Sequence, residues 1–159
     1  MTTSRIGPTK VKPWEADPGR GVVKNPDLIK LNRPHDWQPI QYVSYLWLLV
    51  DQRDLRVGIE TQAAVRRDES GAEVGKGMKR QGRLYGHPTL ANPGSTFRAF
   101  AGGELLYKPS EGGWVINRES GRYGVYRRDK SEGDALMYLV RNLFKELANL
   151  DVRVSTYKV

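Results

Sequence analysis

The stretch of sequence that decides the fold is residues 86–124, which read GHPTLANPGSTFRAFAGGELLYKPSEGGWVINRESGRYG. It contains one of the two histidines of the chain, a glutamate preceded by two glycines, and a polar segment between two glycines. Residues 104–107 and 114–117 favour strands, and the proline and glycines of residues 108–113 predict a hairpin loop between them. We expect the other elements to pack around this hairpin.

A second hairpin is predicted N-terminal to this stretch. Residues 42–50 are apolar on both faces and rich in aromatic and β-favouring side chains, which is typical of a strand buried on both sides. A polar turn at 51–54 follows, and residues 55–61 then alternate with period two. Leu55, Val57 and Ile59 face one way, and we expect Glu60, on the other face, to point into solvent.

Three segments between these hairpins have weaker patterns. Residues 66–81 are glycine-rich and nearly without apolar side chains, which predicts a long loop. Either a basic flap over a site or a disordered insertion fits this composition. Residues 83–87 are expected to form a short strand that ends at Pro88, because the residue before a proline avoids the helical conformation. Residues 95–101 alternate and predict another strand.

One long helix is predicted near the C-terminus. Residues 131–134 fit a capping box, and Leu136, Leu143 and Leu147 belong to an apolar stripe at helical spacing. Asn149 is a plausible stop, and residues 151–156 alternate as a closing strand. The predicted fold class is therefore α+β: a mostly antiparallel sheet with one long C-terminal helix packed on it.

The chain divides into a proline-rich arm and one domain. Residues 1–41 hold six of the nine prolines, so we expect an extended N-terminal arm, and residues 42–159 are expected to form a single α+β domain. His35, in this arm, is interpreted as an exposed turn histidine. The chain has no cysteine, and we expect neither a metal nor a cofactor.

The charge balance indicates polyanionic partners. The 159 residues carry a formal net charge of +8, with 26 Lys and Arg against 18 Asp and Glu. The partner classes are nucleic acid, a nucleotide, or an acidic inhibitor or immunity protein. No membrane partner is expected, because no segment has the apolar length of a membrane span. Without an apolar signal-peptide core, the expected location is the cytoplasm, or outside the cell after secretion by a dedicated machine.

Three side chains in the central stretch are candidate catalytic residues. His87 lies between a glycine and a proline, and its imidazole titrates near neutrality, so it can exchange protons with a substrate. Glu104 follows two glycines, which allow a ligand or another backbone to approach closely. Arg122 offers a planar fork that fits phosphate oxygens. Each also has a structural interpretation: a turn histidine, an exposed strand residue and an ordinary glycine turn.

Three neighbouring side chains are candidate substrate-binding residues. Asn117 and Ser120 offer hydrogen bonds, and Tyr123 offers a ring on which a base or nicotinamide could stack. The glycines at 121 and 124 allow positive φ, so that successive backbone N–H groups can form an anion-binding nest.

These motifs resemble a module found in plant IQ-motif calmodulin-binding proteins and in C-terminal domains of bacterial polymorphic toxins. In that module the segments read roughly H-S-S-F, A-G-E and S-G-H-Y-R-P, against residues 87–90, 101–105 and 120–125 here. The resemblance covers about residues 42–155. Arg122 replaces the second histidine of the module, and residues 124–125 replace its Arg-Pro, so a mechanism with two histidines is not carried over. No IQ-type helix is present, and calmodulin binding is not carried over either.

Three functional hypotheses follow. The first is a toxin-like effector enzyme that cleaves RNA or another nucleotide substrate without a metal: Glu104 takes the 2′-hydroxyl proton, His87 protonates the leaving oxygen and Arg122 stabilises the phosphate charge. The second is NAD cleavage or ADP-ribosyl transfer, in which Glu104 stabilises an oxocarbenium-like ribose. The third is a non-catalytic basic module that binds nucleic acid or a protein partner.

Overall fold

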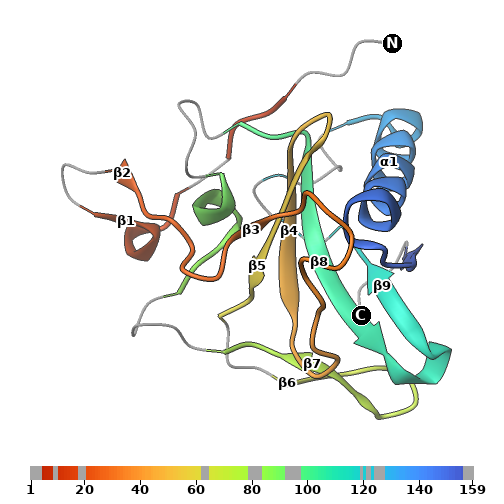
Figure 1. Cartoon of the computed structure of the whole chain (residues 1–159). Coiled ribbons are helices and arrows are strands. Elements are labelled where there is room, and N and C mark those ends of the chain that lie inside the picture. The colour runs from red at the N-terminus through yellow and green to blue at the C-terminus, as the bar shows by residue number, and fades with distance from the viewer. Residues whose placement is uncertain are drawn as a thin grey trace.

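Six strands form the central sheet of the protein, in the order β10-β9-β8-β4-β5-β3 (Figure 1). The structure is a computed structural model that describes residues 5–8, 11–17, 21–61, 65–78, 84–91, 98–118, 120, 123 and 128–155. All neighbouring strands of this sheet are antiparallel except β10 and β9. The fold is α+β, as the sequence predicts. The strands are β3 (Ile29–Lys30), β4 (Tyr45–Asp51), β5 (Asp54–Ile59), β8 (Ala101–Lys108), β9 (Gly113–Ile116) and β10 (Val152–Val154).

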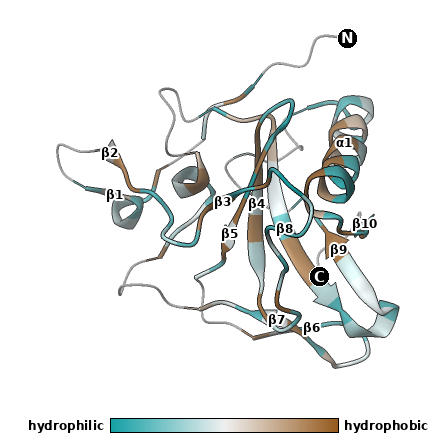
Figure 2. Ribbon diagram, viewed as in Figure 1, coloured by the Kyte–Doolittle hydropathy of each residue, from teal (hydrophilic) through white to brown (hydrophobic). Residues whose placement is uncertain are grey.

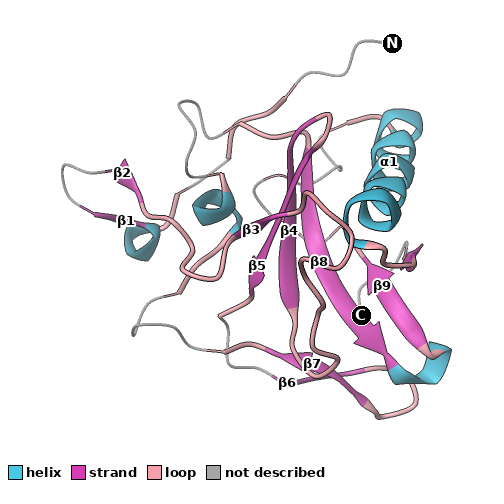
Figure 3. Ribbon diagram, viewed as in Figure 1, coloured by secondary structure: helices cyan, strands magenta, loops and turns pink. Residues whose placement is uncertain are grey.

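The remaining elements are short, apart from one helix (Figure 3). Two small antiparallel pairs lie outside the central sheet. None of the described helices is long and apolar enough to cross a bilayer. These elements are η1 (Pro13–Glu15), β1 (Ala16–Asp17), β2 (Gly21–Val22), β6 (Val65–Arg67), β7 (Glu73–Lys76), the 3-10 helix η2 (His87–Leu90), η3 (Pro109–Glu111) and the helix α1 (Lys130–Ala148).

Helix α1 covers one face of the sheet. Its apolar stripe packs against side chains of β4, β5, β8 and β9, and Figure 2 shows hydrophobic and hydrophilic residues interleaved along it, as in an amphipathic helix. The side chain of Asp129 caps its start by accepting a hydrogen bond from the backbone N–H of Glu132. Asn149 ends it in the left-handed conformation, at φ 52°. The buried layer includes Tyr45, Trp47, Leu49, Leu55, Val57, Leu105, Ile116, Met137, Val140, Leu143 and Phe144.

The opposite face of the sheet is covered by η2 and by the N-terminal arm. Leu46 and Leu48 of β4 point to this face and pack with Leu90 of η2. The backbone N–H of Asn25, in the arm, donates to the carbonyl of Thr89 at 3.1 Å, so arm and η2 are joined to each other. Both faces of the central strands β4, β5 and β8 are therefore largely buried.

A buried arginine of β5 fixes η2 to the sheet. Arg56 of β5 points to the same face as Leu48, its partner in the strand register. Its guanidinium binds Asp54 through Nε and Nη2, at 3.0 and 2.9 Å, and its Nη1 donates to the carbonyl of Leu90 at 3.0 Å. A charge-assisted bidentate pair of this kind has strict geometry, so η2 is held at a defined position over the strands.

Both predicted hairpins are confirmed. Strands β4 and β5 pair around the predicted turn, and β8 and β9 pair with Leu105 opposite Ile116. Asn149 ends the helix as expected, and β10 closes the sheet. His35 is exposed and lies in a turn.

Several local predictions are wrong. Residues 66–81 are not one long loop, because β6 and β7 pair there as a short hairpin. Residues 84–86 are not a strand, and the chain enters η2 directly; residues 81–83 and 92–97 lie outside the described residues. The helix cap is Asp129 rather than the predicted box at residues 131–134. Glu60 is buried, not solvent-facing, since Ser44 Oγ donates to its Oε2 at 2.5 Å.

Candidate active site

The predicted site residues that the structure describes gather on the η2 face of the sheet. They are His87, Glu104, Asn117, Ser120 and Tyr123, and each is at most 6% exposed. Arg122 lies outside the described residues, so its predicted role stays a prediction. The site is polar and buried, and a buried polar group is stable only when its hydrogen bonds are made.

Glu104 lies in the middle of β8, opposite Leu46, and thus on the η2 face. Asn117, just after β9, binds both its backbone and its side chain. Asn117 Oδ1 accepts from the Glu104 backbone N–H at 2.9 Å, and Asn117 Nδ2 donates to Glu104 Oε1 at 3.1 Å. On the opposite face, Trp47 Nε1 donates to the Glu104 carbonyl at 3.2 Å. The carboxylate is therefore held by a residue that continues the neighbouring strand.

His87 is the first residue of η2. Its Nε2 lies 2.8 Å from the carbonyl oxygen of Gly103. A carbonyl can only accept a hydrogen bond, so Nε2 carries the proton, and in the neutral ring the lone pair is on Nδ1. The turn that presents the ring is rigid, because Pro88 is the second residue of η2 and Thr89 Oγ1 donates to the Gly86 carbonyl at 2.6 Å.

Gly102 is the point at which the site elements meet. A Cβ atom added there would lie 2.9 Å from His87 Cδ2 and 3.3 Å from Ser120 Cβ. Its backbone N–H also donates to the carbonyl of Tyr123 at 3.1 Å. Since side chains alternate along a strand, Gly102 and Glu104 are successive residues on one face. The imidazole that rests on Gly102 thus lies on the same face of β8 as the Glu104 side chain.

Ser120 and Tyr123 close the site from a third segment. Ser120 Oγ accepts from the backbone N–H of Tyr123 at 3.1 Å, so the two residues are linked directly. The Tyr123 side chain is fully buried and packs with Leu46, Leu48 and Leu90. Its ring anchors this segment to the sheet, and its predicted stacking on a base stays a prediction.

Sequence reasoning did not identify the residues that position the site. Gly103 is one of them, because a Cβ there would lie 1.9 Å from the carbonyl oxygen of Asn117 and 2.7 Å from Trp47. Arg56, which fixes η2, was also missed, although an arginine within a buried strand is a signal that could have indicated it. Gly102 and Gly103 were predicted to allow close approach of a ligand or of backbone. In the structure, protein atoms of His87, Asn117 and Trp47 occupy that space.

The arrangement supplies a carboxylate and an imidazole with defined partners, which is a set suited to proton transfer. Within the described ranges, no three His, Asp or Glu side chains come together as metal ligands.

Comparison of the chain with protein families, with curated proteins and with solved structures finds no match.

Proposed function

We propose that the protein is a toxin-like enzyme that cleaves RNA or another nucleotide substrate without a metal ion. The observation that carries this proposal is the convergence of His87 and Glu104 on one face of β8, where glycine leaves room for the imidazole. The formal net charge of +8 supports a polyanionic substrate. The resemblance of the motifs to polymorphic toxin domains agrees with this class of reaction.

The mechanism assigns one proton transfer to each group. Glu104 removes the proton of the ribose 2′-hydroxyl as that oxygen attacks the adjacent phosphorus. The bond from phosphorus to the 5′-oxygen breaks, and His87, protonated at Nδ1, gives that proton to the leaving oxygen. The products are a 2′,3′-cyclic phosphate and a free 5′-hydroxyl. Arg122 stabilises the negative charge that develops on the phosphate.

Burial sets a condition on this mechanism. Because His87 and Glu104 are nearly inaccessible, substrate binding has to displace a segment that covers them. The Ser120 side chain makes a local contact with the Tyr123 backbone, whereas the Tyr123 ring packs on the sheet and η2 is tied down by Arg56. We therefore expect Ser120 to move away from the site when the substrate enters.

Two conservative substitutions test the proposal. In His87→Gln the amide nitrogen can still donate to the Gly103 carbonyl, and in Glu104→Gln the amide oxygen can still accept from Asn117. Both variants should fold, yet lose cleavage of total RNA in EDTA by about 10²- to 10⁴-fold, the usual contribution of a general acid or base.

Glu60→Gln is the matched control, because Glu60 is another buried glutamate that accepts a side-chain hydrogen bond on the same face. It should keep wild-type cleavage. Intact RNA at high concentrations of the wild-type protein, or full activity of both site variants, would refute the proposal. Release of nicotinamide from NAD by the same preparation would support the NAD-cleaving alternative instead.

A further inference from the structure

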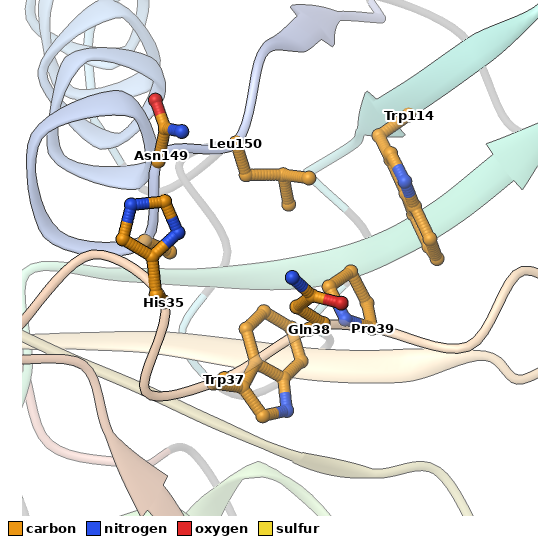
Figure 4. A pocket seen from close by; sticks show the side chains of 8 residues that line it. His35, Trp37, Gln38, Pro39, Trp114, Asn149 and Leu150 are labelled. Carbon is orange, nitrogen blue, oxygen red and sulfur yellow. The ribbon is translucent and has the colours of Figure 1, made fainter.

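A pocket lies on the helix side of the sheet, away from the His87–Glu104 site. Its volume is about 230 Å³ (Figure 4). Trp114 of β9 borders one side of this pocket, and His35 and Asn149 border the other. Gln38, Trp37 and Leu150 lie between them, and Pro39 and Ala148 complete the lining. Residues from the arm, from β9 and from the end of α1 thus surround one hollow.

The backbone of His35 is unusual in a way that points to this pocket. His35 has φ 77°, and His35 and Asn149 are the non-glycine residues of the described chain with positive φ. Asn149 is explained as the helix terminus. His35 occupies the third position of a turn in which Asp36 N–H donates to the Arg33 carbonyl at 3.3 Å. That position in a Pro-containing turn of this type favours glycine, so His35 adopts this conformation at a cost in backbone strain.

The chemistry of the lining fits an uncharged planar ring. The eight lining residues include no Asp, Glu, Lys or Arg. Two indoles, both half-buried, offer apolar surface for stacking. The Gln38 and Asn149 amides and the His35 imidazole offer hydrogen-bond donors and acceptors at the mouth. A charged group would have no counter-ion among these side chains.

The charge of the chain as a whole favours a ring that belongs to a polyanion. The net charge of +8 favours nucleic acid over a neutral sugar as the source of such a ring. Arg33, in the same turn as His35, is exposed and can meet a phosphate. A larger pocket of about 370 Å³ shares Trp37 and Gln38 with this one, which leaves room for further nucleotides of a bound strand.

We infer that the pocket between Trp37, Trp114 and His35 binds a nucleobase of single-stranded nucleic acid. The base stacks on indole surface, and the amide and imidazole groups bind its edge. This goes beyond the cleavage proposal, because it assigns binding to another face of the sheet and holds whether or not His87 and Glu104 are catalytic.

Tryptophan fluorescence during titration tests this inference. The titrants are adenosine 5′-monophosphate, a short oligoadenylate, ribose 5-phosphate and methyl glucoside, added to the wild type and to His87→Gln, which cannot consume the RNA. Both nucleotides should quench fluorescence equally in the two proteins. Ribose 5-phosphate, which lacks the base, should bind much more weakly.

Matched variants locate the site. Trp114→Leu should weaken binding of adenosine 5′-monophosphate by roughly tenfold or more, in line with the loss of one stacked base. His35→Gly should weaken it while leaving the thermal midpoint near that of the wild type, because glycine relieves the positive φ. Trp14→Leu, which changes an exposed tryptophan of η1, should bind as the wild type does.

The inference fails if Trp114→Leu and His35→Gly bind the nucleotides as tightly as Trp14→Leu does. It also fails if ribose 5-phosphate competes as well as the nucleotide, or if methyl glucoside binds in its place. If His87→Gln loses RNA cleavage but still binds the nucleotides, the binding pocket is separate from the cleavage site, as inferred. If the wild type binds the nucleotides but does not cleave RNA, only the cleavage proposal is refuted.

Discussion

The two faces of the central sheet are built from different chemistry. Toward α1, the strands present a layer of aromatic and aliphatic side chains. Toward η2 and the arm, the same strands present Arg56, Glu60 and Glu104 next to glycines, and each polar group has a specific partner. An apolar layer tolerates many packings of similar volume, whereas a buried polar group requires particular atoms at particular distances. The η2 face is therefore where the structure is most sharply specified.

Two adjacent glycines allow this difference to be tested within β8. Gly103 lies opposite Trp47, so a side chain there would point to the α1 face, and Gly102 lies opposite Leu48 and faces η2. The same change, glycine to alanine, thus probes each face from neighbouring positions.

Gly103→Ala should have the largest effect. The new methyl group would meet the carbonyl oxygen of Asn117 at 1.9 Å and the buried indole of Trp47 at 2.7 Å. The backbone of Asn117, which directly follows β9 and donates to the Glu104 carbonyl, cannot move aside cheaply, so we expect the free energy of unfolding to fall by more than about 3 kcal/mol. Urea unfolding would measure it.

Gly113→Ala is the control for this experiment. Gly113 lies on the neighbouring strand, and a Cβ atom there would come no closer than 4.0 Å to another atom. Its effect should stay within about 0.5 kcal/mol, as for ordinary surface changes. Similar losses for both alanines would show that glycine at 103 serves general backbone flexibility and not close packing.

Gly102→Ala should destabilise the protein less than Gly103→Ala does, but it should directly affect RNA cleavage. Its methyl group would lie 2.9 Å from His87 Cδ2, and a side chain can shift where a carbonyl cannot. We expect about 1–3 kcal/mol of destabilisation. Displacement of the imidazole should lower RNA cleavage by up to about a hundredfold. Cleavage at the wild-type rate in this variant, measured well below its unfolding temperature, would contradict the role of His87.

The α1 face could be predicted from the sequence because its signals are periodic. The helical spacing from Leu136 to Leu147 and the alternation of Leu55, Val57 and Ile59 each indicate a buried side. The pairing of both hairpins followed from turn residues between apolar runs. The cap was misplaced because Ser131 and Asp129 are both acceptable capping residues, and only the geometry shows which one binds the Glu132 N–H.

The η2 face could be predicted only in part. Alternation places Glu60 and Glu104 opposite the helix, but it does not reveal that η2 and a proline-rich arm cover that side. The candidate residues His87, Glu104, Asn117, Ser120 and Tyr123 were found from their types and their glycine neighbours. The meeting of His87 and Ser120 at Gly102, on the face that carries Glu104, depends on strand register, which no local pattern in the sequence determines.

The smallest change in stability is expected for the ion pair that links the segment after β9 to helix α1. Arg118 directly follows Asn117 of the site, and its guanidinium binds Asp134 on α1. The hydrogen bond from Arg118 and, second, that from Lys130 lower the pKa of the Asp134 carboxyl below its usual value. A carboxyl with a lowered pKa stabilises the folded state above its unfolded pKa, and this contribution disappears as the pH falls through the folded pKa.

Asp134→Asn should therefore be slightly less stable than the wild type at neutral pH, because the pair is partly exposed and such pairs contribute little. The difference should shrink as the pH falls below about 4, the usual aspartate pKa, where the wild-type carboxyl also loses its charge. Thermal unfolding of both proteins across this pH range measures it. Asp151→Asn, whose ion pair with Lys145 lies at the other end of α1, is the control. If RNA cleavage falls only in Asp134→Asn, the Arg118–Asp134 pair transmits changes on the α1 face to Asn117, which holds Glu104. If both variants cleave RNA normally, the two faces work independently.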